Sequence, residues 1–379
     1  MKNKILTLCV LIFLSLSAIA QDNNPIVTAV PSLSIAPDSR AGAMGDVGVA
    51  TSPDANSQYW NPAKYVFMES EAGVSLSYTP WLRKLVSDID LVYLAGYWKF
   101  DQRSAISASL RYFSLGDITL MDQLGYPQGS AHPNEIAVDA AYSRKFSDKF
   151  SGSVAFRFIY SDLNNGINLT GGTEMYPGTS VAADVAAYYK TPITMETGDG
   201  TLALGMNISN IGSKVSYDQM ETSNFIPTNL RLGGSFDYPI DNFNRISVSA
   251  DVNKLLVPTP VLDPTLEQIT AYNNMSPLTG IFKSFNDAPG GMSEELREIM
   301  WSVGAEYAYN NQFFVRGGYF NENQYKGNRK YFTAGAGFKL NVFQLDAAYV
   351  ISTSQSNPLD QTLRFSLTFD LFGLKNLVK

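Results

Sequence analysis

Cysteine and histidine are almost absent from this chain of 379 residues, which has one of each, Cys9 and His132. Cys9 lies in an apolar stretch that we expect to be cleaved off, so the mature chain would have no disulfide and no thiol ligand. A histidine metal site needs more than one histidine, and a catalytic triad would have to be built on His132 alone. We therefore predict no catalytic residues, no metal and no cofactor, and we do not expect an enzyme.

Charge is also scarce, because only 17% of the residues are charged, against the quarter that is usual in a soluble domain. Without Lys2 and Lys4 the chain keeps 26 basic residues against 35 acidic ones, which is a formal charge of −9. A chain of this sign does not attract nucleic acid through its bulk charge. We therefore expect no nucleic-acid partner.

Long apolar runs are missing too, except at the N-terminus. Lys2 and Lys4 precede an apolar stretch over 5–16, and Ala18-Ile19-Ala20 forms an A-x-A site. This pattern is typical of a secretory signal peptide, which we predict over 1–20. No later run approaches 18 apolar residues, so a mature chain that lies in a membrane must cross it as a β-barrel.

What the sequence does contain is strict alternation of apolar and polar residues. In TLRFSLTFDLF (362–372), Phe365 and Phe369 are apolar, whereas Arg364 and Thr368 between them are polar. Successive side chains of a strand point to opposite faces, so this pattern predicts a strand with one apolar face. About fourteen such segments occur, at 72–79, 88–100, 103–115, 134–146, 149–161, 180–190, 200–210, 227–238, 245–254, 299–309, 312–320, 330–339, 342–351 and 361–371.

The connections between these segments alternate between short and long. Asp101-Gln102 and Asn310-Asn311 are tight turns, 191–199 and 239–244 are somewhat longer, and the intervening loops such as 116–133 and 162–179 are long. Strands of about ten residues, tilted by roughly 40°, span about 25 Å, the height of the lipid-facing band of a barrel. A soluble sandwich also alternates, but its strands average five or six residues.

We therefore predict an all-β protein, a 14-stranded antiparallel transmembrane β-barrel over 72–379 with long extracellular loops. It would lie in the outer membrane of a Gram-negative bacterium, with both termini in the periplasm. In the last strand, Phe365 would face lipid, and Thr362, Arg364, Thr368 and Asp370 would face the lumen. Arginines also fall on other inferred lumen faces, and we expect them to pair with acidic residues across the barrel rather than to line a selective channel: Arg111, Arg157, Arg231, Arg316 and Arg364.

Two segments do not fit the strand pattern. Residues 21–71 precede the first strand, and the loop 255–298 is far longer than ordinary loops. Asp263-Pro264 could open a helix in this loop, and Ser293 could cap a second one. Seven apolar residues of the loop form either an exposed patch for a partner or a lid that packs on the barrel mouth: Leu266, Ile269, Tyr272, Leu278, Ile281, Phe282 and Phe285.

The stretch DSRAGAMGDVGVATSPDANSQYWNPA (38–63) resembles the N-terminal segment of the FadL-type superfamily of outer-membrane barrels. More narrowly, SEELREIMWSVGAEYAY (293–309), FFVRGGYFNEN (313–323) and GNRKYFTAGAGFK (327–339) resemble the PorV family, the outer-membrane components of the type IX secretion system of Bacteroidetes. The resemblance implies fourteen strands and a hatch over 21–71 that lies inside the barrel. The hatch motif comprises Arg40, Gly42, Met44, Gly45, Asp54, Trp60, Asn61 and Pro62.

The resemblance also implies a function in protein transport. PorV-like proteins carry secreted cargo: they bind the C-terminal signal domain of the cargo at an SprA-type translocon. They then deliver the cargo to a PorU-type sortase and attachment complex, which can join it to lipopolysaccharide at the cell surface. The alternative is a FadL-like transporter of long-chain fatty acids or other hydrophobic solutes. A general porin is disfavoured, since the segment before the barrel would fill the lumen.

Overall fold

The computed structural model describes residues 24–83, 86, 88–121, 124–164, 176–196, 198–218, 222–353 and 359–377. The predicted signal peptide over 1–20 lies outside the described residues. Among the described helices, none is both long and apolar enough to cross a membrane.

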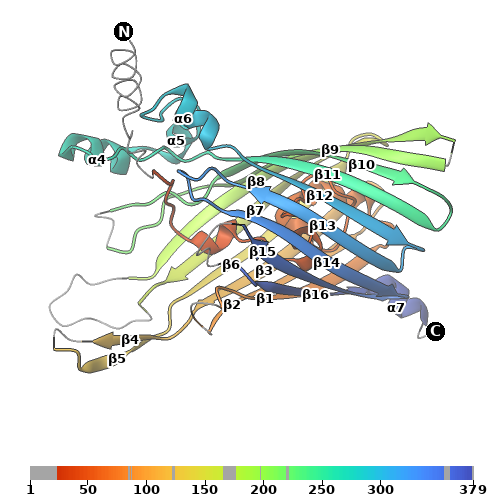
Figure 1. Ribbon diagram of the computed structural model, residues 1–379, viewed down its shortest axis with the longest axis horizontal. Coiled ribbons are helices and arrows are strands. Elements are labelled where there is room, and N and C mark those ends of the chain that lie inside the picture. Colours follow the sequence, from red (N-terminus) through yellow and green to blue (C-terminus); the bar gives the residue numbers. More distant parts are fainter. Residues whose placement is uncertain are drawn as a thin grey trace, which may run out of the picture.

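Fourteen antiparallel strands close into one barrel, as predicted (Figure 1). Each strand pairs with its neighbours along the chain, and β1 closes the ring by pairing with β16 from Gly73↔Asp370 to Tyr78↔Phe365. The strands are β1 Ala72–Pro80, β2 Ile89–Lys99, β3 Ser104–Leu115, β6 Asn134–Lys145, β7 Phe150–Asp162, β8 Gly178–Met195, β9 Gly198–Gly212, β10 Asn229–Pro239, β11 Asn244–Leu255, β12 Met300–Tyr309, β13 Phe313–Asn321, β14 Lys330–Leu340, β15 Phe343–Ser352 and β16 Leu363–Asp370.

The alternation in the sequence corresponds to the two faces of the barrel wall. In β16, Phe365 and Phe369 are exposed on the outside, whereas Arg364 and Ser366 are buried inside. Thr362 and Arg364 are buried and Thr368 and Asp370 are half-buried, which agrees with their predicted lumen-facing positions.

Three features differ from the predicted strand layout. The predicted loop 116–133 contains a hairpin of β4 (Ile118–Met121) and β5 (Pro127–Ala131), and a short helix, α7 (Leu371–Leu377), follows β16. The connection predicted at 191–199 is wrong, because β8 and β9 continue until Met195 pairs with Gly198. Pro192 and Gly200 are residue types that end many strands, and here both lie within the ladder.

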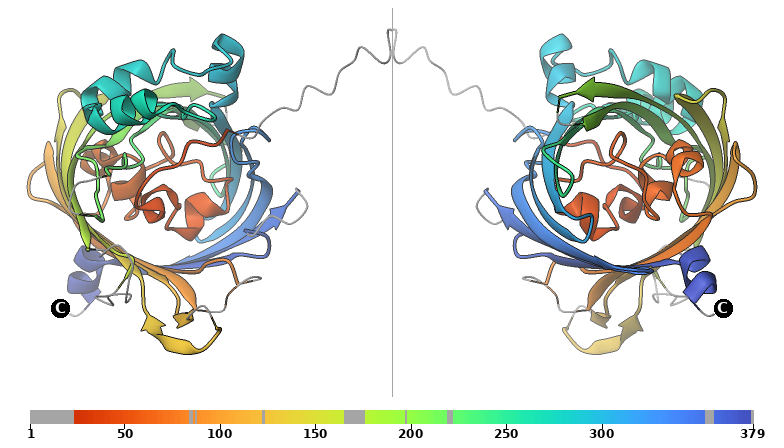
Figure 2. Two further views of the ribbon diagram at one scale, coloured as in Figure 1. Left: turned by 90° about the vertical axis from the view of Figure 1, so that its left-hand side faces the viewer. Right: turned by 90° about the vertical axis from the view of Figure 1, so that its right-hand side faces the viewer.

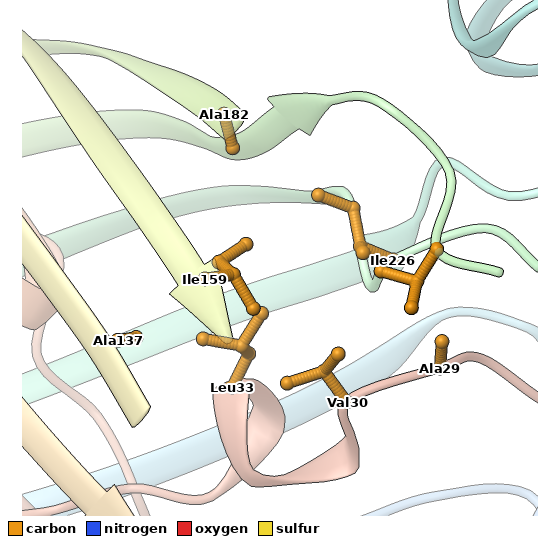
Figure 3. Packing of buried hydrophobic residues seen from close by; sticks show 8 residues of the cluster. Ala29, Val30, Leu33, Ala137, Ile159, Ala182 and Ile226 are labelled. Carbon is orange, nitrogen blue, oxygen red and sulfur yellow. The ribbon is translucent and has the colours of Figure 1, made fainter. Parts of the chain in front are cut away.

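Residues 24–71, here called the N-terminal segment, run through the inside of the ring of strands (Figure 2). They form four short helices, η1 (Pro31–Ser34), α2 (Ser39–Gly42), α3 (Ser57–Trp60) and η2 (Pro62–Phe67). Val30 and Leu33 pack against Ile159 of the barrel wall and Ile226 of a loop (Figure 3). This apolar contact fixes the start of the segment to the wall.

The long connections gather at one end of the barrel, here called the loop end, and the short ones at the other, the turn end (Figure 1). Residues 255–298, here called the loop cap, lie at the loop end and contain α4 (Leu266–Asn274), α5 (Pro277–Lys283) and α6 (Met292–Arg297). The two predicted helices are present as α4 and α6, but their predicted caps are wrong: Thr265 caps α4 with Gln268 as a capping box, and Gly291 precedes α6. The sequence prediction missed α5, which Ser276 caps.

The two ends of the described chain lie at opposite ends of the barrel. Asn24 donates through its backbone N to Tyr325 O (3.0 Å) and through Nδ2 to Pro260 O (2.9 Å), both at the loop end. The C-terminal α7 packs beside β1 at the turn end (Figure 1). The prediction that both termini share one side of the membrane is therefore wrong for the described chain.

The register of β16 can be tested at Phe365. Phe365→Arg would place a charge on the lipid-facing side near the middle of the strand, so we expect it to cost about 2–4 kcal/mol of barrel stability. Phe365→Leu, which keeps the residue apolar, is the control and should change stability by less than about 1.5 kcal/mol. Unfolding of both variants in detergent would be followed by the shift of the folded band on gels. Normal stability of Phe365→Arg would contradict this register.

Candidate functional site

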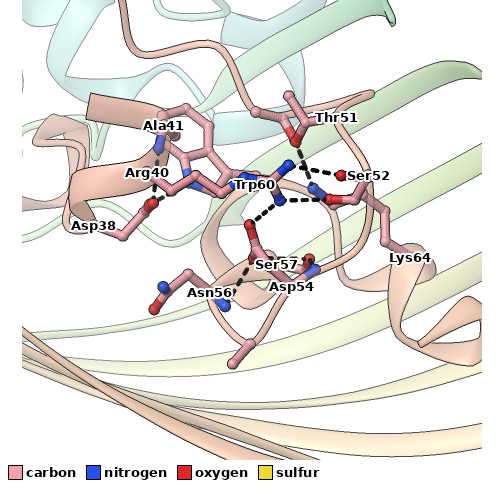
Figure 4. A network of polar contacts seen from close by, with 12 residues as sticks. Asp38, Arg40, Ala41, Thr51, Ser52, Asp54, Asn56, Ser57, Trp60 and Lys64 are labelled. Carbon is pink, nitrogen blue, oxygen red and sulfur yellow. Dashed lines mark hydrogen bonds and ion pairs between the residues drawn. The ribbon is translucent and has the colours of Figure 1, made fainter. Parts of the chain in front are cut away.

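Arg40 lies at the centre of the predicted hatch motif, inside the lumen. Its Nη1 donates to Ser52 O (3.0 Å) and Asp54 Oδ2 (2.9 Å), so it joins two parts of the N-terminal segment to each other (Figure 4). Its Nε and Nη2 donate to the two carboxylate oxygens of Glu306 on β12, at 3.1 and 3.0 Å. The guanidinium therefore binds one carboxylate of the segment and one of the barrel wall, in the planar geometry that arginine favours.

This contact continues across the wall as a chain of alternating charges. Arg316 on β13 donates through Nε to Glu306 (2.6 Å) and through Nη1 to Asp346 on β15 (2.6 Å). All three barrel residues are buried. A buried charge without a partner destabilises the folded state. Removal of one of these residues would leave its neighbours as unpaired buried charges.

Asp38, Trp60 and Asn61 hold the rest of the motif in place. Asp38 caps α2 by accepting from Ala41 N (3.0 Å), and it also accepts from Trp60 Nε1 (2.6 Å). Burial raises the pKa of the Asp38 carboxyl to about 6. Asn61 donates to Val49 O (3.0 Å) in the segment and to Ala187 O (2.9 Å) in β8, and Pro62 begins η2.

The glycines of the motif allow the backbone of the segment to approach its neighbours closely. Gly45 has φ +73°, and a Cβ there would lie 2.7 Å from the backbone N of Tyr319 in β13. A Cβ on Gly42 would lie 2.5 Å from the guanidinium of Arg364. From the wall side, a Cβ on Gly318 would lie 2.1 Å from the carbonyl carbon of Met44. The segment and the wall therefore pack backbone to backbone on this side of the lumen.

All eight motif residues lie in the N-terminal segment inside the ring of strands, and the structure adds residues that the sequence analysis did not single out. Asp251 on β11 accepts from Gly48 N (2.8 Å) and Val49 N (3.0 Å). Lys64 is buried and donates to Gly48 O (2.8 Å) and Thr51 Oγ1 (3.1 Å), and burial lowers its pKa to about 8. Glu306 lies in one of the stretches that carried the family resemblance, but alternation alone gave it no role.

The five lumen arginines divide into two groups. Arg157, Arg316 and Arg364 pair with carboxylates, namely Asp139 and Asp184 for the first, Glu306 and Asp346 for the second, and Asp46 for the third. The prediction of acidic partners is confirmed for these three. Among the described residues, Arg111 and Arg231 form no ion pair and instead contact the N-terminal segment and an asparagine of the wall.

Two of the cavities that the described residues enclose lie in the lumen. One, of about 80 Å³, lies beside Tyr59 and Trp60 and is lined by wall residues that include Arg111 and Arg231. The other, of about 500 Å³, is lined by Phe67 to Ser70 and by turn residues such as Asn311 and Val342, so it lies at the turn end. In the described part of the chain, no group of three or more histidine, cysteine, aspartate or glutamate residues is arranged to hold a metal ion.

The seven apolar residues predicted in the loop cap differ in how far their side chains are exposed. Leu266 is 80% exposed and Phe282 is 78% exposed, and Ile269, Leu278 and Phe285 are exposed as well. Tyr272 and Ile281 are half-buried, and the ring of Tyr272 packs edge-on against Phe225, with 5.3 Å between the ring centroids. Five of the seven therefore face outward, and Tyr272 holds the cap down on a neighbouring loop.

Ion pairs fasten α6 of the cap to the barrel. Lys254 at the end of β11 binds Glu295 (3.0 Å) and Glu298 (2.6 Å). Lys326 of the β13–β14 loop binds Glu298 (3.0 Å) and Glu294, and Asn24 donates to Glu294 (3.1 Å). The cap, a neighbouring loop and the start of the N-terminal segment therefore meet in one cluster.

Removal of the Arg40 guanidinium tests whether it joins the segment to the wall. We expect Arg40→Gln to cost about 3–5 kcal/mol, since Asp54 and Glu306 lose a buried partner. The control is Arg245→Gln, which breaks a pair with Asp237 at a side chain that is 45% exposed and should cost about 0–1 kcal/mol. Thermal unfolding and protease sensitivity of the N-terminal segment would be compared, and equal losses in the two variants would contradict this role.

The buried ammonium of Lys64 predicts a pH dependence. Its pKa is lowered in the folded protein, so between about pH 8 and pH 10 the unfolded chain binds more protons and stability rises with pH. Lys64→Met removes this titration. The melting temperature of the wild type should therefore rise relative to that of Lys64→Met over this range, whereas a constant difference would show that Lys64 does not titrate there.

The chain matches the family model "Type IX secretion system protein PorV" over residues 18–262, and no curated protein matches it. Among solved structures, the toluene transporter TodX of Pseudomonas putida superimposes with a TM-score of 0.52 at 10% identity, covering 87% of this chain and 96% of TodX. A FadL homologue of Pseudomonas aeruginosa gives a TM-score of 0.44 at 12% identity, covering 92% and 99%.

The likeness to TodX concerns the fold alone, a closed antiparallel barrel. The family match spans more than half of the chain and includes the Arg40 motif and the first nine barrel strands. The chain therefore belongs to the PorV family of outer-membrane proteins of the type IX secretion system.

Proposed function

We propose that this protein is a cargo carrier of the type IX secretion system. It binds the C-terminal signal domains of secreted proteins at an SprA-type translocon and delivers them to a PorU-type sortase and attachment complex near the lipopolysaccharide surface. Membership of the PorV family supports the secretion system, and the loop cap supports binding through the surface rather than transport through the lumen.

The observation that carries this proposal is the outward apolar surface of the loop cap. Leu266 on α4 and Leu278 and Phe282 on α5 are well exposed, although the same cap is fastened to the barrel by buried ion pairs through α6. Exposed apolar patches mark sites of protein–protein interaction, and these three side chains lie on two consecutive helices of one cap. A folded signal domain is a partner that can cover such a surface.

The N-terminal segment supports a binding role in a second way. We propose that it is a hatch that keeps the lumen closed while cargo binds at the loop end, since Arg40 joins it to β12 and Asn61 joins it to β8. The loop end would face the cell exterior, so that Asn24 lies outside and α7 lies in the periplasm. In a barrel closed in this way, cargo would bind to the surface of the loop end and would not pass through the lumen.

Transport of a hydrophobic solute is the second candidate, and the fold likeness to the toluene transporter TodX favours it. The cavity beside Tyr59 argues against it, because arginine, aspartate and asparagine side chains share its lining with the aromatic ones. Strand pairing is also continuous around the described barrel, with a register shift in the wall only between Ala183 and Val185.

Paired variants of exposed residues test the carrier function. We expect Leu266→Ser with Phe282→Ser to reduce co-purification of proteins bearing C-terminal signal domains by roughly tenfold or more, since buried apolar anchors dominate interfaces. The matched control is Ile118→Ser with Met121→Ser on the β4–β5 hairpin, whose side chains are also exposed. Both variants should keep the folded band on gels. Unchanged capture by the cap variant, or equal losses in both, would mean that the cap is only a lid.

A further inference from the structure

The smaller lumen cavity has a feature that the carrier function does not use: two arginines that form no ion pair with any described carboxylate. Arg111 on β3 is 3% exposed, its Nη1 donates to Ile35 O (2.9 Å) and Ser32 O of the N-terminal segment, and its Nη2 is buried without a hydrogen-bond partner. Arg231 on β10 donates through Nε to Asn253 Oδ1 (2.7 Å) and has no carboxylate within ion-pair distance among the described residues. Both arginines line the cavity.

Tyr59 brings these two cations together. The guanidinium carbon of Arg111 lies 4.9 Å from the centroid of the Tyr59 ring, and that of Arg231 lies 5.5 Å from it. The two charges are therefore within about 10 Å of each other, across a ring that also lines the cavity. The Trp60 ring lies 4.5 Å from the Arg231 guanidinium carbon and covers it on one side.

The carboxylates that line the same cavity are already engaged. Asp139 binds Arg157 (2.9 Å), and Asp46 binds Arg364 and accepts from Tyr331 (2.6 Å). A guanidinium keeps its charge at all relevant pH values, so neither Arg111 nor Arg231 can become neutral by losing a proton. Two further carboxylates attract these cations from outside the cavity lining, Glu135 acting on Arg111 and Asp251 acting on Arg231, but neither forms an ion pair with its arginine. Two buried or half-buried cations that share a cavity and form no ion pair favour the binding of an anion between them.

We propose that the cavity between Arg111, Arg231 and Tyr59 binds a small anion, a phosphate or a carboxylate group. Both groups accept the parallel hydrogen bonds that guanidinium groups donate. The cavity volume of about 80 Å³ is enough for a group of this size. The hydroxyl of Tyr93, which also lines the cavity, offers one more donor from the wall.

An ion-binding series on the intact purified barrel tests the site. Unfolding temperature would be measured with increasing phosphate or butyrate at constant ionic strength, with chloride as the reference ion. We expect a saturable rise of about 2–4 °C with at least one of the two ions, and the effective ion identifies the group. Arg231→Gln should abolish the rise, whereas Arg83→Gln, which changes an exposed loop arginine outside the cavity, should keep it.

A second variant covers the case in which Arg231→Gln does not fold. Asn229 lines the cavity and has a buried Oδ1 without a partner, so Asn229→Asp would supply a built-in carboxylate. It should raise the unfolding temperature and remove the response to both ions. A fall in the unfolding temperature of Asn229→Asp would overturn the proposal, as would equal ion responses in wild type and Arg231→Gln or no response to either ion.

Discussion

The buried guanidinium of Arg40 is the interaction on which the rest of the structure depends. It cannot lose its charge, so it must be surrounded by acceptors wherever it lies. Here Asp54 supplies acceptors from its own segment and Glu306 from the barrel wall. A chain with this arginine inside the lumen is therefore constrained to fold its N-terminal segment against β12, and the charges of Arg316 and Asp346 extend that constraint to β13 and β15.

Close packing of the segment backbone against the wall backbone adds to the contacts made by the charged residues. The ion pairs set which face of the segment meets the wall, and Gly45 and Gly318 then allow the two backbones to approach. The start of the same segment continues to the loop end, where Asn24 reaches the ion-pair cluster beneath α6. The inside of the barrel and the surface of the loop cap are therefore parts of one connected structure, which gives the proposed carrier an ordered rim on which to hold cargo.

The sequence predicted the wall far better than the contents of the lumen. Alternation of period two, as in Leu363 to Asp370, is a local signal, and it gave all fourteen strands to within a few residues. The extension of β8 and β9 was missed because Pro192 and Gly200 usually end strands. The motif residues were found through a family resemblance, but Glu306, the partner of Arg40, lies more than 200 positions away. The same is true of Asp251, the partner of Gly48 and Val49, and alternation marks both carboxylates only as lumen-facing. The sequence also identified the apolar residues of the loop cap but not which of them face outward. Their orientation depends on tertiary contacts such as that of Tyr272 with Phe225.

The central claim is that the protein carries cargo of the type IX secretion system, and deletion of its gene tests this most directly. Periplasmic and surface fractions of the deletion strain would be compared by mass spectrometry with those of the strain carrying the intact gene. The account predicts that proteins with uncleaved C-terminal signal domains accumulate in the periplasm and disappear from the surface. Intact secretion together with reduced uptake of a long-chain hydrophobic compound would contradict it and would identify a solute transporter instead.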